Sequence, residues 1–215
     1  MFFSSFIPRV GFYITPIIIN LNIIIFMMMV IAGLGTFSLN YNLLSFKDGD
    51  LLSWGANFKP SIINGEWWRL LTCTFLHTGL MHLFLNMYVL FFVGGFLEPR
   101  LVKTKFALFY LVAGALANIT ILWRPDGTVS AGASAAIFGL YGVILSLLLT
   151  KKIFPKDFNK GFLRSTLIYV VICLLLEFAG ASNAVHLGGL TSGFILGLVF
   201  TRRTKEGYKS KIMIK

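Results

Sequence analysis

Six apolar stretches along the chain are long enough, or nearly long enough, to cross a lipid bilayer. A transmembrane helix needs about 20 predominantly apolar residues. The first stretch exceeds the apolar core of about 7–15 residues in a secretory signal peptide, so we expect a retained transmembrane helix. The stretches cover 16–37, 80–97, 106–122, 132–149, 162–178 and 184–200. The pattern predicts an all-α membrane protein built as a bundle of six transmembrane helices.

The segment 38–69, between the first two apolar stretches, is too polar to span a membrane. It contains Trp54, Trp67 and Trp68, and tryptophan side chains favour the interface between membrane and water. We therefore expect a long first loop that carries short interfacial helices.

The chain is expected to fold as one domain. Its sequence has no evident internal repeat and no low-complexity linker. A short N-terminal segment, 1–15, precedes the six-helix domain over 16–200, and a basic tail, 201–215, follows it.

The composition agrees with this membrane assignment. Hydrophobic residues make up 57% of the chain and charged residues 13%, with a mean hydropathy of +0.82. Soluble domains contain about 25% charged residues. The chain has too few polar side chains to cover a surface that faces water, which excludes a soluble globular enzyme and a disordered chain.

The net charge of +11 would indicate nucleic-acid binding in a soluble protein. In a membrane protein, basic residues instead gather in cytoplasmic loops. With the N-terminus in the cytoplasm and six alternating spans, 15 of the 19 basic residues fall in cytoplasmic segments and 4 fall outside. We therefore expect a multi-pass protein of the cell membrane with both termini in the cytoplasm. The compact six-span form is typical of the plasma membrane of a prokaryote.

Four polar residues lie within apolar stretches, where a polar side chain is costly and needs a reason. They are His82, Asn86, Ser134 and His186. They come from the second, fourth and sixth spans, and the expected topology places all of them in the outer half of the bilayer. We expect them to converge on one pocket.

Ser134 lies just inside the start of the fourth span. Helix N-termini offer unpaired backbone N–H groups and the positive end of the helix dipole, which would stabilise a developing oxyanion. The alternative is that Ser134 caps the helix or lets two helices approach closely.

His186 precedes Gly189, Gly193 and Gly197, which are spaced on one helix face. Such a face lets a neighbouring backbone approach closely. If the neighbour is the fourth helix, His186 can reach Ser134, and serine with histidine forms a nucleophile and its general base. The alternative is a hydrogen-bonded histidine in the core.

His82 and Asn86 are four residues apart and share a helix face. They can both donate hydrogen bonds into one pocket, or they can form a polar clamp between helices without chemistry. Metal binding is a competing role for histidines, but His77 and His82 are badly spaced for shared ligation and no carboxylate accompanies them. We expect no metal site.

Three further residues receive no chemical role from the sequence. Cys73 and Cys173 lie in apolar surroundings, where cysteine packs as a small hydrophobe, so no disulfide is expected. Glu177, near the end of the fifth span, has no evident partner in the sequence.

With these motifs in this order, the chain resembles the rhomboid intramembrane serine proteases over about 67–200. The motifs are a Trp-Arg pair, HxxxN with a second histidine five residues earlier, GxSx, and a histidine before a glycine ladder. They correspond to Trp68-Arg69, His82 to Asn86 with His77, Gly132 to Ala135, and His186 to Gly189 and Gly193. The segment from Gly94 to Arg100 is similar too. The chain departs from the family at Ala135, where the family usually has glycine, which changes packing beside the serine and removes no catalytic group.

The resemblance implies hydrolysis of a peptide bond in or beside the transmembrane segment of a membrane-protein substrate. Ser134 would be the nucleophile and His186 the general base of a dyad. His82, Asn86 and the backbone N–H groups of Ser134 and Ala133 would bind the oxyanion. Substrate would enter sideways between helices in the bilayer, with the fifth helix as the gate.

Several residues of the family motifs are expected to act structurally: Trp68, Arg69, His77, Gly132, Ala135, Gly189 and Gly193. No cofactor, metal or nucleic-acid partner is expected, because the sequence has no nucleotide-binding pattern. Two alternatives remain. A non-catalytic rhomboid-like protein would bind membrane proteins without cutting them, and a small transporter would show inverted halves or helices broken at mid-depth, which the sequence lacks.

Overall fold

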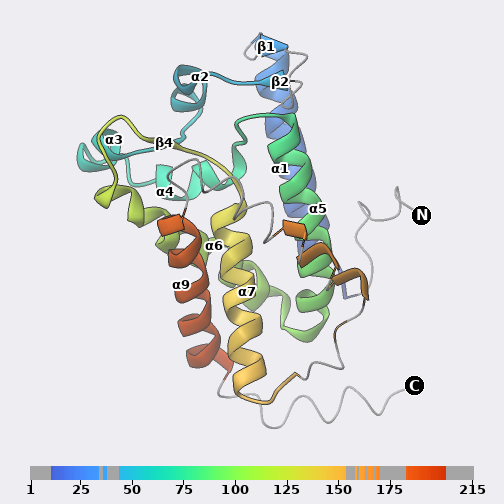
Figure 1. Ribbon diagram of the computed structural model, residues 1–215. Helices are drawn as coiled ribbons and strands as arrows, with labels where there is room; N and C mark the ends of the chain where they lie inside the picture. The colour runs from blue at the N-terminus through green and yellow to red at the C-terminus, as the bar shows by residue number, and fades with distance from the viewer. Residues whose placement is uncertain are drawn as a thin grey trace.

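The computed structural model describes residues 11–33, 36–37, 44–153, 158, 160–162, 164–166, 168–169 and 183–201. Within these residues the protein is mainly helical (Figure 1). Its long helices are α1 (Ile14–Ile31), α5 (Leu80–Leu97), α6 (Lys103–Asn118), α7 (Ser134–Leu149) and α9 (Asn183–Thr201).

Three described segments are long and apolar enough to cross a membrane: Ile14–Ile31, Leu80–Arg100 and Lys103–Trp123. Shorter apolar helices cover Ser134–Leu149 and Ala184–Phe200. Of the expected fifth span, 162–178, only residues 162, 164–166 and 168–169 are described, and they are helical. The structure thus supports a membrane protein, while the count of six spans remains a prediction.

Apart from η3, which continues the far end of α5, the short elements gather at one end of the bundle, beside the start of α5 and α7 (Figure 1). Strands β1 and β2 pair antiparallel, and so do β3 and β4. Short 3-10 turns η2, η3 and η4 follow α4, α5 and α6. The bounds are β1 Thr36–Phe37, β2 Leu44–Ser45, α2 Asp48–Ser53, β3 Asn57–Phe58, α3 Lys59–Ile63, α4 Arg69–Thr72, η2 Cys73–Phe75, η3 Glu98–Arg100, η4 Ile119–Trp123 and β4 Val129–Ser130.

The first helix is shorter than the apolar run that predicts it. The sequence places its end at residue 37, but α1 ends at Ile31 and residues 36–37 form β1. Gly33 adopts a left-handed φ of +75° just beyond the helix. Glycine accepts this conformation at no steric cost and often ends helices there, even where the following residues are apolar.

A buried carboxylate ties α1 to the end of α5. Glu98 is 1% exposed and accepts hydrogen bonds from the backbone N–H groups of Tyr13, Ile14 and Thr15, at 2.6, 2.7 and 2.8 Å. The hydroxyl of Thr15 donates a fourth bond at 2.7 Å. These N–H groups have no partner inside the helix, and a negative charge is stabilised beside a helix N-terminus.

Glycines let α7 and α9 pack backbone against backbone. A Cβ atom on Gly193 would collide with the carbonyl of Gly139, and one on Gly189 would collide with the carbonyl of Ala135. A side chain on Gly142 would likewise meet the α9 backbone. Small residues allow this approach between membrane helices. The contact brings the beginning of α7 next to the first turn of α9.

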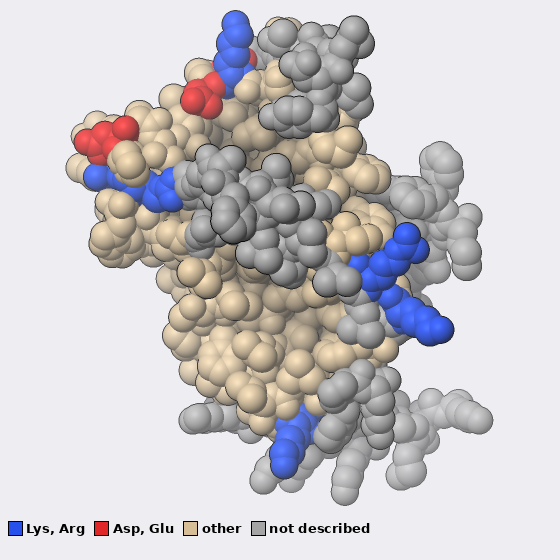
Figure 2. Space-filling view, viewed as in Figure 1, with Lys and Arg blue, Asp and Glu red and all other residues tan. Residues whose placement is uncertain are grey.

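Charged side chains are unevenly placed on the face drawn in Figure 2. Among the described residues in view, acidic side chains lie only at the end of the molecule that carries α2 and α3, where Lys59 forms an ion pair with Asp126 at 2.9 Å. Basic side chains appear at this end and elsewhere on the same face.

Candidate active site

Ser134 and His186 meet where α7 and α9 begin. Ser134 lies just inside a helix N-terminus, as the sequence predicts: it is the first residue of α7, and Ala133 is the N-cap. The Nε2 atom of His186 lies 3.0 Å from the Oγ atom of Ser134, within hydrogen-bond distance. His186 is 9% exposed. The structure therefore joins two of the four polar residues that the sequence places in one pocket.

Phe138 holds the plane of the His186 ring. The two rings stack with centroids 4.4 Å apart and planes inclined by 16°. Phe138 lies four residues after Ser134, so it faces the same side of α7. This spacing is the signal by which the sequence could have identified it, but an aromatic residue in an apolar span looks like ordinary core.

Gly132 makes room for the His82 ring beside Ser134. Its φ of +144° is a conformation that favours glycine. A Cβ atom on Gly132 would lie 2.7 Å from Cε1 and 3.0 Å from Nε2 of His82, and 3.8 Å from the Oγ atom of Ser134. The Nε2 edge of His82 and the Ser134 hydroxyl therefore border the same small space.

Asn86 is near His82 as predicted, but its amide is already engaged. The Nδ2 atom donates to the backbone carbonyl of His82 at 2.9 Å, one turn earlier on α5. Its Oδ1 atom accepts a hydrogen bond from the Tyr169 hydroxyl at 3.3 Å. Asn86 is 1% exposed. The sequence missed Tyr169, because a contact between residues so distant along the chain leaves no local pattern.

His77 is buried beside the site. Its ring lies 5.2 Å from the ring of His82, edge to face. Burial, and secondarily the neighbouring His82, lowers the pKa of His77 well below its usual value. His77 is therefore a neutral packing residue under ordinary conditions.

The backbone that leads to Ser134 is held by the preceding segments of the chain. Strand β4 pairs with β3, matching Val129 with Phe58 and Ser130 with Asn57. The N–H of Gly132 donates to the carbonyl of Cys73 at 2.9 Å. These contacts fix the turn that enters α7, so the segment between α1 and α5 acts on the position of the serine.

Cys73 contributes its backbone rather than its thiol. The side chain is buried and makes no disulfide. Burial raises the pKa of the Cys73 thiol to about 12, so it stays protonated and unreactive. Cys173 and Glu177 lie outside the described residues.

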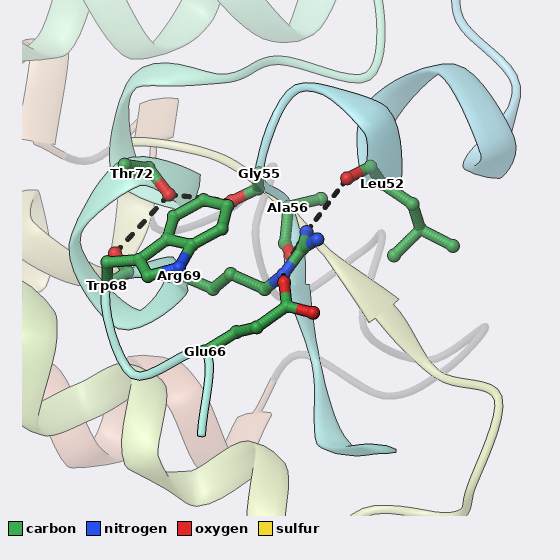
Figure 3. A network of polar contacts seen from close by, with 7 residues as sticks. All are labelled: Leu52, Gly55, Ala56, Glu66, Trp68, Arg69 and Thr72. Carbon is green, nitrogen blue, oxygen red and sulfur yellow. Dashed lines mark hydrogen bonds and ion pairs between the residues drawn. The ribbon is translucent and has the colours of Figure 1, made fainter. Parts of the chain in front are cut away.

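Arg69 links the segments on either side of β3 by hydrogen bonds, and the Trp68 ring packs against its guanidinium (Figure 3). The Nη1 atom of Arg69 donates to the carbonyls of Leu52 and Ala56, at 2.8 and 3.0 Å. Its Nε atom pairs with Glu66, and its guanidinium lies 4.7 Å from the Trp68 ring centre. The predicted Trp-Arg pair thus serves the architecture of this segment and does not reach Ser134 by any contact among the described residues.

The remaining predicted site residues lie beside Ser134 or in the contact between α7 and α9. Ala133 and Ala135 are buried on either side of Ser134, and Gly189 and Gly193 form the contact with α7. Among the described residues, no three His, Cys, Asp or Glu side chains gather as metal ligands.

The arrangement has the parts that acyl transfer requires. A serine hydroxyl next to an imidazole can be activated as a nucleophile. The first backbone N–H groups of α7 have no partner within the helix and point toward the same end. Such donors stabilise the negative charge that develops on a carbonyl oxygen.

Comparison with known proteins identifies relatives of this chain. The family described as Rhomboid domain matches residues 64–203. YdcA of Bacillus subtilis is 34% identical over 154 residues, which cover 71% of this chain and 77% of YdcA. The rhomboid protease GluP of the same bacterium is 39% identical over 165 residues, which cover 74% of this chain and 31% of GluP. RHOMBOID-like protein 1 of Arabidopsis thaliana is 39% identical over 145 residues, which cover 66% of this chain and 37% of that protein. The chain thus spans most of YdcA but well under half of the other two.

Proposed function

The chain belongs to the rhomboid family, and from this membership and the geometry of the site we propose that it is an intramembrane serine endopeptidase. It hydrolyses a peptide bond in or next to the transmembrane segment of a membrane protein. The observation that carries the proposal is the distance of 3.0 Å between His186 Nε2 and Ser134 Oγ at the start of α7.

In the first half of the reaction, the Oγ atom of Ser134 attacks the carbonyl carbon of the scissile bond, and its proton passes to Nε2 of His186. The resulting oxyanion accepts hydrogen bonds from the backbone N–H groups of Ser134 and Ala133, and from His82 and Asn86. When the C–N bond breaks, His186 returns the proton to the leaving amine. An acyl ester on Ser134 and a free amine result.

In the second half, water attacks the acyl ester and gives a proton to His186. The ester bond to Ser134 breaks, the proton returns to the serine oxygen, and a carboxylic acid leaves. The stacked Phe138 ring keeps the imidazole in one plane while the proton moves in both directions. We propose a dyad of Ser134 and His186, with no metal or organic cofactor.

The proposal places the site in the outer half of a bilayer crossed six times, with both termini in the cytoplasm. Trp67 and Trp123 support it, because they are 56% and 78% exposed near the end of the bundle that holds Ser134, and tryptophan favours the membrane interface. Substrate enters sideways between helices. Relatives come from a bacterium and a plant, so the proposal is for a multi-pass membrane protein and does not depend on a prokaryotic source.

One observation favours a second candidate function, a rhomboid-like protein that binds membrane proteins without cutting them. The Asn86 amide, a proposed oxyanion donor, is occupied by the His82 carbonyl and the Tyr169 hydroxyl. In the first mechanism Asn86 still offers a hydrogen bond to the oxyanion, because its amide carries two hydrogens and only one of them is donated to the His82 carbonyl.

The test is cleavage in proteoliposomes. The purified protein is reconstituted with a library of single-span fusion proteins of varied transmembrane sequence, and products are read by mass. We expect cleavage within or beside the span by wild type and by Ser53→Ala, which changes a serine in α2 remote from the site. Ser134→Ala should cut nothing. Cleavage by Ser134→Ala would refute the nucleophile, and binding without cleavage by wild type would favour the second function.

A further inference from the structure

The hydroxyl of Thr78 lies beside the ring of His82, on the side away from Ser134. Thr78 Oγ1 is 3.0 Å from His82 Nδ1. Thr78 lies in the loop before α5, four residues before His82. Its side chain therefore contacts the His82 ring from outside the helix. Among the described residues, this is the one hydrogen bond that the structure gives to the His82 ring.

The backbone of Thr78 is fixed independently of its side chain. The N–H of Phe46 donates to the Thr78 carbonyl at 3.0 Å. The neighbouring Gly79 forms an antiparallel bridge with Ser45 and is the N-cap of α5. The Thr78 hydroxyl is therefore presented to His82 from a backbone held on both sides.

The opposite edge of the His82 ring faces the reaction space. Cε1 and Nε2 lie against Gly132, in the space that also borders the Ser134 hydroxyl. The ring of His77 packs on a third side. The ring thus has one nitrogen at Thr78 and the other at the place where the proposed oxyanion develops.

The hydrogen bond at one ring nitrogen decides what the other nitrogen can do. In a neutral imidazole one nitrogen carries the proton and the other accepts, and the partner of one nitrogen sets which is which. If the Thr78 hydroxyl donates to Nδ1, the proton resides on Nε2. If Nδ1 donates to Thr78 instead, Nε2 is an acceptor and cannot stabilise an oxyanion.

We propose that Thr78 is a positioning residue for His82: its hydroxyl donates to Nδ1, fixes the ring plane and keeps the proton on Nε2, which faces Gly132 and Ser134. This inference rests on the proposed function, because it assigns the support of one oxyanion donor. Thr78 is exposed, so water can partly replace its hydroxyl and the expected effect is moderate.

The test measures the rate at which a fluorophosphonate probe labels Ser134 in the detergent-purified full chain, since the phosphoryl oxygen of the probe occupies the oxyanion position. Thr78→Val keeps the shape of the side chain and removes the hydroxyl. We expect its labelling rate to fall about three- to tenfold, the effect of one lost hydrogen bond. Thr78→Ser, which keeps the hydroxyl, should restore a rate close to wild type.

A matched control and a second background separate positioning from a general structural effect. Thr150→Val removes a hydroxyl that bonds carbonyls of its own helix at the far end of α7, and it should label like wild type. In a His82→Ala background, Thr78→Val should cause no further loss, because a residue that acts through His82 has nothing left to position. If Thr78→Val does not fold, Thr78→Ala takes its place, and its labelling rate is measured in the wild-type and His82→Ala backgrounds.

Two results would overturn the inference while the proposed function stands. In the first, Ser134 of Thr78→Val is labelled as fast as Ser134 of wild type. In the second, Thr78→Val lowers the labelling rate by the same factor in the wild-type and His82→Ala backgrounds. Wild-type protein that is not labelled at Ser134 would overturn the proposed function and this inference together.

Discussion

The carbonyl of Gly139 on α7 lies where a Cβ atom on Gly193 of α9 would have to be. This contact sets the spacing of the two helices whose first turns carry Ser134 and His186. The distance between the serine hydroxyl and the imidazole is thus determined one to two turns away, by backbone packing that only glycine permits.

Gly193→Ala should separate α7 from α9 and weaken the Ser134–His186 contact. We expect the free energy of unfolding to fall by about 1–3 kcal/mol, as for other overpacked cores, and proteolysis to fall with it. Thermal unfolding in detergent and labelling of Ser134 measure the two effects. Gly95→Ala is the matched control, because a Cβ atom there meets only Phe12 at an ordinary 3.7 Å. Equal losses in the two variants would contradict the role of this helix contact.

Gly132→Ala should displace the His82 ring and so remove an oxyanion donor. Loss of one such donor typically lowers turnover by about 10²–10³, which the labelling rate of Ser134 would report. Gly127→Ala controls for backbone strain, since Gly127 has a φ of +93° and a Cβ atom there would meet nothing within 4 Å. If both variants lose the same factor, strain rather than collision with His82 is responsible.

Asn86→Ala should slow the reaction without abolishing it, because Asn86 is one of several proposed donors. A loss of up to about 10²–10³ in turnover is the usual range for a single donor. Tyr169→Phe, which removes the hydroxyl bound to Asn86 Oδ1, should cause a smaller loss in the same assay. Complete inactivity of a folded Asn86→Ala variant would show that Asn86 does more than share the oxyanion.

Glu98→Gln should destabilise the fold and leave the chemistry intact. The buried carboxylate binds three backbone N–H groups at the start of α1, and an amide presents one oxygen and no charge to them. We expect a loss of about 1–3 kcal/mol in unfolding free energy, with an unchanged labelling rate at low temperature. Asp48→Asn, at an exposed position in α2, should change neither, and an equal loss there would argue against the special role of Glu98.

The sequence predicts the helices well where an apolar run is bounded by polar or glycine residues. It predicts the second span over 80–97, which are the bounds of α5, and it predicts the start of α7 near Ser134 as well. It places the end of α1 too late, because apolar residues continue past Gly33. A hydropathy pattern contains no information about the left-handed backbone conformation of Gly33, which ends the helix. The fifth expected span is described only in part, so the prediction of six spans is not tested as a whole.

The geometry around His82 and Asn86 shows what a sequence pattern leaves out. Spacing of four residues places both side chains on one face of α5, but it does not reveal that the amide bonds the His82 carbonyl. In the sequence, Thr78 looks like an ordinary loop residue. In the structure, its loop packs against residues 45–46, and this contact brings the Thr78 hydroxyl to the His82 ring. Tyr169 and Phe138 read as core aromatics, because their partners come from other turns and other helices.

Above all, we propose that Ser134 is a nucleophile activated by His186. The most direct measurement treats the purified full chain with a fluorophosphonate, digests it and locates the modified residue by mass spectrometry. We expect an adduct on Ser134 in wild type that is lost in heat-unfolded protein and nearly lost in His186→Ala. An adduct on another residue, no adduct on folded wild type, or undiminished modification of Ser134 in His186→Ala would contradict it.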